Sequence, residues 1–167
     1  MARWTKSYKL PKKIKHYSLS VPIGKEIWTM SGSFHELKLD IVIFNTETRT
    51  FTTVESELPE TFKDSSVSHT SYNDQIYVWS CSDIHESATK SLHRLDTKTL
   101  EWEHIITIEK EYTSCVVIED FMYVLDCPGR TRVVTEENAH IVPSPIVPTH
   151  LDTIDLKKKE LISSRLL

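Results

Sequence analysis

Three stretches of the chain are versions of one another, spaced by about fifty residues. Asn45–Phe51 (NTETRTF) matches Asp96–Trp102 (DTKTLEW) at an offset of 51 residues, and Asp155–Leu161 (DLKKKEL) follows after a further 59. An apolar run precedes each stretch, at residues 27–30, 76–79 and 122–125. A period near fifty residues built from β-strands is typical of propeller blades. Because a blade buries its faces only against neighbouring blades, the repeat predicts a piece of a ring.

The pattern within each unit predicts four short antiparallel strands. Residues 41–44 are rich in β-branched side chains and lead into a polar turn that starts at Asn45. Asp96 starts the equivalent turn in the second unit, and an Asn or Asp side chain at this position can accept hydrogen bonds from backbone N–H groups two residues on. The pairs 73–74 and 119–120 are predicted to be turns between the inner strands.

The repeats divide the chain into an arm, three blades and a tail. We expect a basic N-terminal arm over residues 1–16, blades over 17–58, 59–110 and 111–161, and a C-terminal tail over 162–167. The arm has a second interpretation, in which Trp4 marks a strand that completes a blade. The third blade carries an insertion at 127–149, whose four prolines predict an exposed loop without regular structure.

Composition excludes several classes of protein. With 167 residues, 39% of them apolar and 26% charged, the chain is long enough for one domain with a real core. The formal net charge of −4 argues against a nucleic-acid partner, and the basic arm is interpreted as solvated. No run of ~18 apolar residues predicts a membrane span, and no signal peptide is expected. The three scattered cysteines are interpreted as reduced thiols of a cytoplasmic or nuclear protein.

The sequence resembles kelch repeats over about residues 17–161. Blades of that family carry an apolar strand ending in a glycine pair, then a tyrosine or acidic turn residue, then a tryptophan about six residues later. Asp96–Trp102 matches this pattern well and Asn45–Phe51 matches it in part. Other residues stand at the glycine pairs, namely Ser31-Gly32, Ser80-Cys81 and Asp126-Cys127. Residues 2–5 and 40–45 are most similar to the kelch domain-containing subfamily.

The resemblance implies an all-β, partial kelch-type propeller of about three four-stranded antiparallel blades, acting as a protein-interaction module. Kelch propellers grip a peptide or a partner domain with loops around a central depression. Relatives in the named subfamily are substrate receptors of cullin–RING ubiquitin ligases and read carboxyl-terminal peptides. Their adaptor-binding box, a Ser/Thr-Leu with a cysteine four residues after the leucine, is missing: Ser91-Leu92 leads to Asp96, and Thr99-Leu100 leads to His104.

The binding surface is expected in the loops 31–39, 80–90 and 127–149. His35, His85, Arg130 and Arg132 are the polar candidates in these loops. The two arginines suit an acidic tail or a terminal carboxylate, because guanidinium offers a planar fork of hydrogen-bond donors. The alternative interpretation is that all four are ordinary solvated side chains.

A catalytic or metal-binding role is not predicted, and we expect no cofactor. Cys81, Asp83 and His85 match no zinc pattern with paired ligands. Cys115 lies inside an apolar run, where a thiol is expected to be inert packing. The acidic pairs Glu36/Asp40 and Glu119/Asp120 are interpreted as turn and rim residues rather than as acid–base groups.

Three blades are fewer than the five to seven of closed kelch rings, so apolar blade faces are expected at both ends. We expect a second copy of the chain, as a homo-dimer, or another protein to close the ring, or else a truncated gene product. A structural or oligomerising scaffold is therefore the alternative function. The large aromatic residues of the strands are predicted to form the core between blades rather than a ligand cage: Trp28, Tyr77, Trp79, Trp102 and Tyr123.

Overall fold

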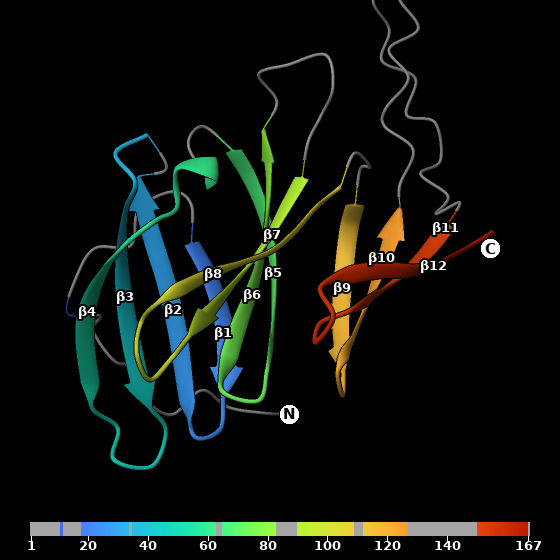
Figure 1. Cartoon of the computed structure of the whole chain (residues 1–167). Helices are drawn as coiled ribbons and strands as arrows, with labels where there is room; N and C mark the ends of the chain where they lie inside the picture. The colour runs from blue at the N-terminus through green and yellow to red at the C-terminus, as the bar shows by residue number, and fades with distance from the viewer. Residues whose placement is uncertain are drawn as a thin grey trace, which may run out of the picture.

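The computed structural model describes residue 11 and residues 18–33, 35–62, 65–82, 90–108, 112–126 and 150–166. Within them, three four-stranded sheets and one short 3-10 helix account for the regular structure (Figure 1). In every sheet the strands follow one another in chain order, and all neighbours are antiparallel. The three sheets are the blades of the fold.

Each blade is an up-and-down meander. Blade 1 contains β1 (Ser18–Ile23), β2 (Glu26–Ser33), β3 (Lys38–Asn45) and β4 (Phe51–Glu57). The helix η1 (Glu60–Phe62) connects it to blade 2, which contains β5 (Ser65–Tyr72), β6 (Gln75–Ser82), β7 (Lys90–Asp96) and β8 (Trp102–Ile108). Blade 3 contains β9 (Tyr112–Ile118), β10 (Phe121–Asp126), β11 (His150–Asp155) and β12 (Glu160–Leu166).

The sheets can be set beside the ranges predicted from the repeats. They span 18–57, 65–108 and 112–166, against predicted blades at 17–58, 59–110 and 111–161. The C-terminal boundary differs, because β12 pairs with β11 as far as Leu166 and so takes up most of the expected tail. The bulge in this pairing, between Thr153 and Ile154, shifts the register in a way that the repeat does not predict. The arm, apart from Pro11, and the insertion 127–149 lie outside the described residues.

The outer turn of each blade has the predicted side-chain cap. The side-chain oxygen of Asn45, Asp96 or Asp155 accepts two backbone N–H groups, from the second and third residues after it, at 2.8–3.1 Å. The fourth residue after it is Arg49, Leu100 or Lys159, which has a φ of 62°, 61° or 58°. This residue donates its N–H to the backbone carbonyl of the capping residue at 2.8–2.9 Å. The prediction for these turns is confirmed.

The inner turns lie beside the outer turns at the same edge of each blade. Asn73 and Asp74 both have positive φ, 48° and 57°, as a two-residue type I′ hairpin requires. The carbonyl of the second inner-turn residue accepts the N–H of the residue after the cap in each blade, at 2.9–3.3 Å. In each blade an exposed ion pair also joins the inner turn to the outer turn: Lys25–Glu47 at 2.6 Å, Asp74–Lys98 at 3.5 Å and Asp120–Lys157 at 2.6 Å. The charges are reversed in blade 1.

The hydrophobic core lies between the blades and is built from alternating faces of the strands. On β6, Ile76 and Val78 pack against blade 1, whereas Tyr77 and Trp79 pack against blade 3. Trp28, Tyr77 and Trp79 are buried and Trp102 is partly buried in these two clusters, which confirms their predicted place. Tyr123 differs, because it lies on the face of blade 3 that points away from blade 2.

The innermost strands β1, β5 and β9 run side by side and bring the blades around one axis (Figure 1). Ser71 of β5 donates its hydroxyl to the Pro22 carbonyl of β1 at 2.9 Å. His69 Nε2 donates to the Ser20 carbonyl at 3.3 Å. Two backbone carbonyls of β1 thus accept hydrogen bonds from side chains of β5 in the next blade. The arrangement is that of propeller blades.

Gly32 is the one glycine at the three positions where kelch repeats carry a glycine pair, and its surroundings explain why a glycine is needed there. A Cβ at Gly32 would lie 2.3 Å from the Lys38 carbonyl oxygen, a backbone atom that cannot move aside cheaply. The tight connection from β2 to β3, in which Leu37 has a φ of 54°, brings this carbonyl close. A side chain at position 32 is therefore incompatible with this turn.

Candidate functional site

The connections β2–β3, β6–β7 and β10–β11 leave the blades at one edge, opposite the capped turns (Figure 1). The strands that lead into these connections end at Ser33, Ser82 and Asp126. The strands that return from them begin at Lys38, Lys90 and His150. We call this edge the loop edge. The described strands that flank the three predicted binding loops therefore end and begin at this edge.

Of the four predicted site residues, one lies among the described residues of these connections and three lie outside them. His35 is described, and its exposed side chain lies in the turn between β2 and β3. His85 belongs to residues 83–89, which join β6 to β7, and it lies outside the described residues. Arg130 and Arg132 belong to residues 127–149, which join β10 to β11, and they also lie outside. The fold therefore brings three connections to one edge, and the grouping of the four side chains stays a prediction.

Two buried charged side chains occur in the interface between blades 2 and 3, near the loop edge. Lys90, the first residue of β7, is 8% exposed and shares a strand face with Leu92. Asp152 of β11 is fully buried on the same face as Ile154. Neither side chain is without a partner. Sequence reasoning missed both residues. A single charged residue within a strand is predicted to be exposed, and only the opposing blade shows that it is buried.

A second buried polar group lies between blades 1 and 2. His93 of β7 is 3% exposed, and its Nε2 is 3.1 Å from Thr61 Oγ1 in η1. Its ring contacts those of Phe62 and His104, with centroids 4.9 and 5.2 Å away. Burial, and then the nearby His104, lower the pKa of His93 from 6.5 to about 4. His93 is therefore a neutral, structural histidine at neutral pH.

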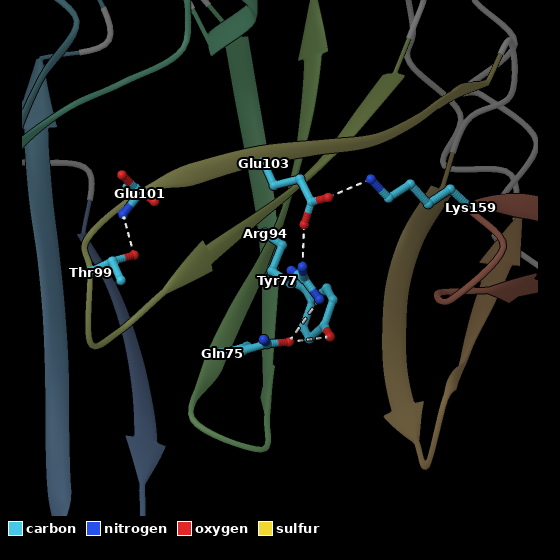
Figure 2. A network of polar contacts seen from close by, with 7 residues as sticks. All are labelled: Gln75, Tyr77, Arg94, Thr99, Glu101, Glu103 and Lys159. Carbon is cyan, nitrogen blue, oxygen red and sulfur yellow. Dashed lines mark hydrogen bonds and ion pairs between the residues drawn. The ribbon is translucent and has the colours of Figure 1, made fainter.

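A polar network joins blades 2 and 3 at the edge of the capped turns (Figure 2). Glu103 of β8 accepts hydrogen bonds from Arg94 of β7 and from Lys159 of blade 3. Gln75 Oε1 accepts from the Tyr77 hydroxyl at 2.9 Å and from Arg94 Nη1 at 3.3 Å. The hydrogen bond from Lys159 lowers the pKa of the Glu103 carboxyl, and burial raises the pKa of Tyr77. One of these hydrogen bonds joins blade 3 to blade 2, so the network fits a link between blades better than a reactive site.

The described residues offer little for catalysis or metal binding. Burial raises the pKa of the Cys115 thiol to about 11, which leaves almost no thiolate at neutral pH. In the described ranges no group of three or more His, Cys, Asp and Glu residues could hold a metal ion. A cavity of about 10 Å³ between blades 1 and 2, lined by Met30, Leu39 and Phe62 among others, has room for at most one water molecule.

No helix among the described residues is long and apolar enough to cross a membrane.

No protein-family model matches the sequence, and no curated protein does. Solved structures do resemble the fold. YjhT matches with a TM-score of 0.59 at 10% identity, over 93% of this chain and 52% of that one. The described chain is a partial β-propeller. At this identity the likeness shows the fold alone.

Two further structures come from Pyrococcus proteins. The β-propeller domain of the trilobed protease from Pyrococcus furiosus, described as having an open velcro topology, matches with a TM-score of 0.47 at 14% identity over 93% of this chain and 45% of that one. Acylaminoacyl peptidase of Pyrococcus horikoshii matches with a TM-score of 0.48 at 13% identity over 89% and 25%. The chain thus spans between a quarter and about half the length of the structures it resembles.

Proposed function

We propose that this chain is a non-catalytic protein-interaction module that binds a protein or peptide partner at the loop edge. The observation that carries the proposal is the convergence of the three connections β2–β3, β6–β7 and β10–β11 on one edge. The opposite edge is held by short capped turns and ion pairs, which leave little chain free to shape a binding surface. Binding residues are commonly carried by loops on a rigid scaffold.

The chemistry of the partner follows from the residues in those connections. Arg130 and Arg132 suit a carboxylate, either of an acidic side chain or of a chain terminus, because each guanidinium can donate two parallel hydrogen bonds. His35 and His85 would add donors or acceptors from the two neighbouring connections. We therefore propose a peptide with a free carboxyl terminus as the ligand.

The finer form of the proposal is a kelch-type substrate receptor of a cullin–RING ubiquitin ligase, in the cytoplasm or nucleus. It rests on the resemblance of residues 2–5 and 40–45 to kelch domain-containing protein 3. The missing adaptor-binding box speaks against adaptor contact through that motif. Pull-down with a purified cullin–RING adaptor tests this form separately, since a peptide-binding module without a ligase role would bind peptides but not the adaptor.

The experiment is selection from a phage-displayed library of carboxyl-terminal peptides. We expect the wild type to enrich a set of peptides that an R130A/R132A variant binds at least about tenfold more weakly, as loss of two charged hydrogen-bond donors implies. The control is K98A/K157A, which removes the same charge from the opposite edge. Amidation of the peptide carboxyl terminus should also abolish binding.

Circular dichroism melts must show that all variants are folded. Equal enrichment by wild type and R130A/R132A, or no enrichment by the wild type, would contradict the proposal.

A further inference from the structure

The outward face of blade 1, which points away from blade 2, is covered at its centre. Ile41 of β3 packs towards blade 2, so Val42 points the other way. Val42 is only 3% exposed, and Ser31, on the same face, is 4% exposed. Among the described residues, Val42 belongs to neither of the two core clusters. Its neighbours across the sheet, Thr29 and Thr53, stand beside it and cannot lie over it, so another segment of the chain covers this face.

The basic arm, residues 1–16, is the long segment that joins blade 1 beside this face. Blade 2 lies on the opposite face of blade 1, and blade 3 packs on blade 2, so neither blade supplies the cover. The arm enters blade 1 through Tyr17, at the start of a row of paired residues that crosses the outward face: Ser18, Ser31, Asp40 and Glu55. The row spans three strand spacings, about 14 Å, and about five extended residues cover that distance. The arm is therefore long enough to reach the whole row.

The basic arm and this face carry opposite charges. The described strand residues of the face include three carboxylates and one cation, namely Asp40, Glu55, Glu57 and Lys38. Neither Asp40 nor Glu55 is without a partner. The arm contains six Lys and Arg residues and no Asp or Glu. It also carries four large apolar or aromatic side chains, which suit the buried Val42: Trp4, Tyr8, Leu10 and Ile14.

We propose that the basic arm binds the outward face of blade 1 of the same chain, where it takes the place of a neighbouring blade. Its apolar and aromatic side chains cover Val42, and its lysines pair with the carboxylates of the face. The arm is then a cover for a blade face rather than a solvated segment, and Trp4 packs on the face instead of marking a strand that completes a blade. This inference does not depend on the proposed peptide-binding function.

The test is zero-length crosslinking of the full chain with a carbodiimide, which joins a carboxylate to a lysine amine lying against it. Mass spectrometry then identifies the joined residues. We expect the lysines of the arm to be joined to the three carboxylates of the outward face at least about tenfold more often than to Glu101 and Glu160, which are exposed on blades 2 and 3. A mixture of isotope-labelled and unlabelled chains should give links within one chain only, because the arm and the face belong to the same copy.

Two variants of the arm make the test specific. W4A/Y8A removes two aromatic side chains and should lower the yield of these links at least about tenfold. T5A/S7A changes two polar residues of the same arm and should keep the wild-type yield. Both variants leave every described strand residue unchanged, and circular dichroism melts check that the blades are folded. Links spread evenly over all exposed carboxylates, links between two copies, or equal yields from the two variants would overturn the proposal.

Discussion

Lys159 of blade 3 donates a hydrogen bond to Glu103 of blade 2, and the resulting ion pair spans the two blades (Figure 2). Lys159 holds the same turn position as Leu100, whose partly buried side chain packs on the core between blades 1 and 2. The residue in the left-handed conformation of the outer turn thus reaches the preceding blade in both blade 2 and blade 3. This contact is apolar between blades 1 and 2, and it is an ion pair between blades 2 and 3.

Replacing Glu103 by Gln should make the protein less stable at neutral pH by about 1 kcal/mol, the usual scale for an exposed or half-exposed ion pair. The hydrogen bond from Lys159 lowers the folded-state pKa of Glu103 below its ordinary value of 4.5. The stabilisation is therefore present above pH 4.5 and is lost as the pH falls through the folded-state pKa. Urea unfolding of wild type and E103Q at several pH values measures the difference.

The control is E101Q, which changes an exposed carboxylate on the same strand-turn boundary. A stability difference between wild type and E103Q that persists unchanged to pH 2 would show that the carboxylate charge is not what links the blades.

His93 should make the fold sensitive to mild acid. Its folded-state pKa of about 4 lies below the ordinary 6.5, so the unfolded chain takes up this proton first. Stability should fall as the pH drops from 6.5 to 4, by about 2–3 kcal/mol in total, and this contribution should level off below that range. H93Q should flatten the decline of stability with falling pH. Identical pH profiles for wild type and H93Q would exclude His93 as the cause.

Local repeats made much of the fold predictable. The caps at Asn45, Asp96 and Asp155 could be recognised because the hydrogen bonds that define them stay within three residues of the capping side chain. The alternation of Ile76, Tyr77, Val78 and Trp79 likewise needs only the period of a strand whose two faces are both buried. Signals of this kind depend only on residues that are close together along the chain, so they can be recognised in a single sequence.

Contacts between blades were not predictable in the same way. Glu103 and Lys159 are 56 residues apart, and nothing near either residue indicates the other. The burial of His93 depends on η1, and that of Asp152 depends on blade 2. For the candidate site, the sequence places His35, His85, Arg130 and Arg132 in loops, and the meander then brings those loops to one edge. Which side chains meet there depends on loop conformation, which repeats do not encode.

The two described glycines, Gly24 in a turn and Gly32 in strand β2, should respond differently to alanine. G32A forces a Cβ to within 2.3 Å of the Lys38 carbonyl and should cost more than about 2 kcal/mol of unfolding free energy. G24A meets no atom within 4 Å but must keep a φ of 54°, which costs about 1 kcal/mol. G24N should cost less than G24A, because asparagine tolerates this conformation. Chemical denaturation that ranks G24A below G32A in stability would contradict the close approach at Gly32.

Cys115 should resist alkylation in the folded protein. With a pKa of about 11 rather than 9.0, its thiolate population at pH 7.5 is roughly 100-fold smaller than that of an ordinary thiol, and partial burial slows the reagent further. Iodoacetamide labelling of a C81S/C127S variant, followed by mass spectrometry, isolates this thiol. Labelling should be slow in buffer and fast in denaturant. If the folded variant instead reacts as fast as free cysteine, Cys115 has an activated thiolate, and a catalytic role would have to be reconsidered.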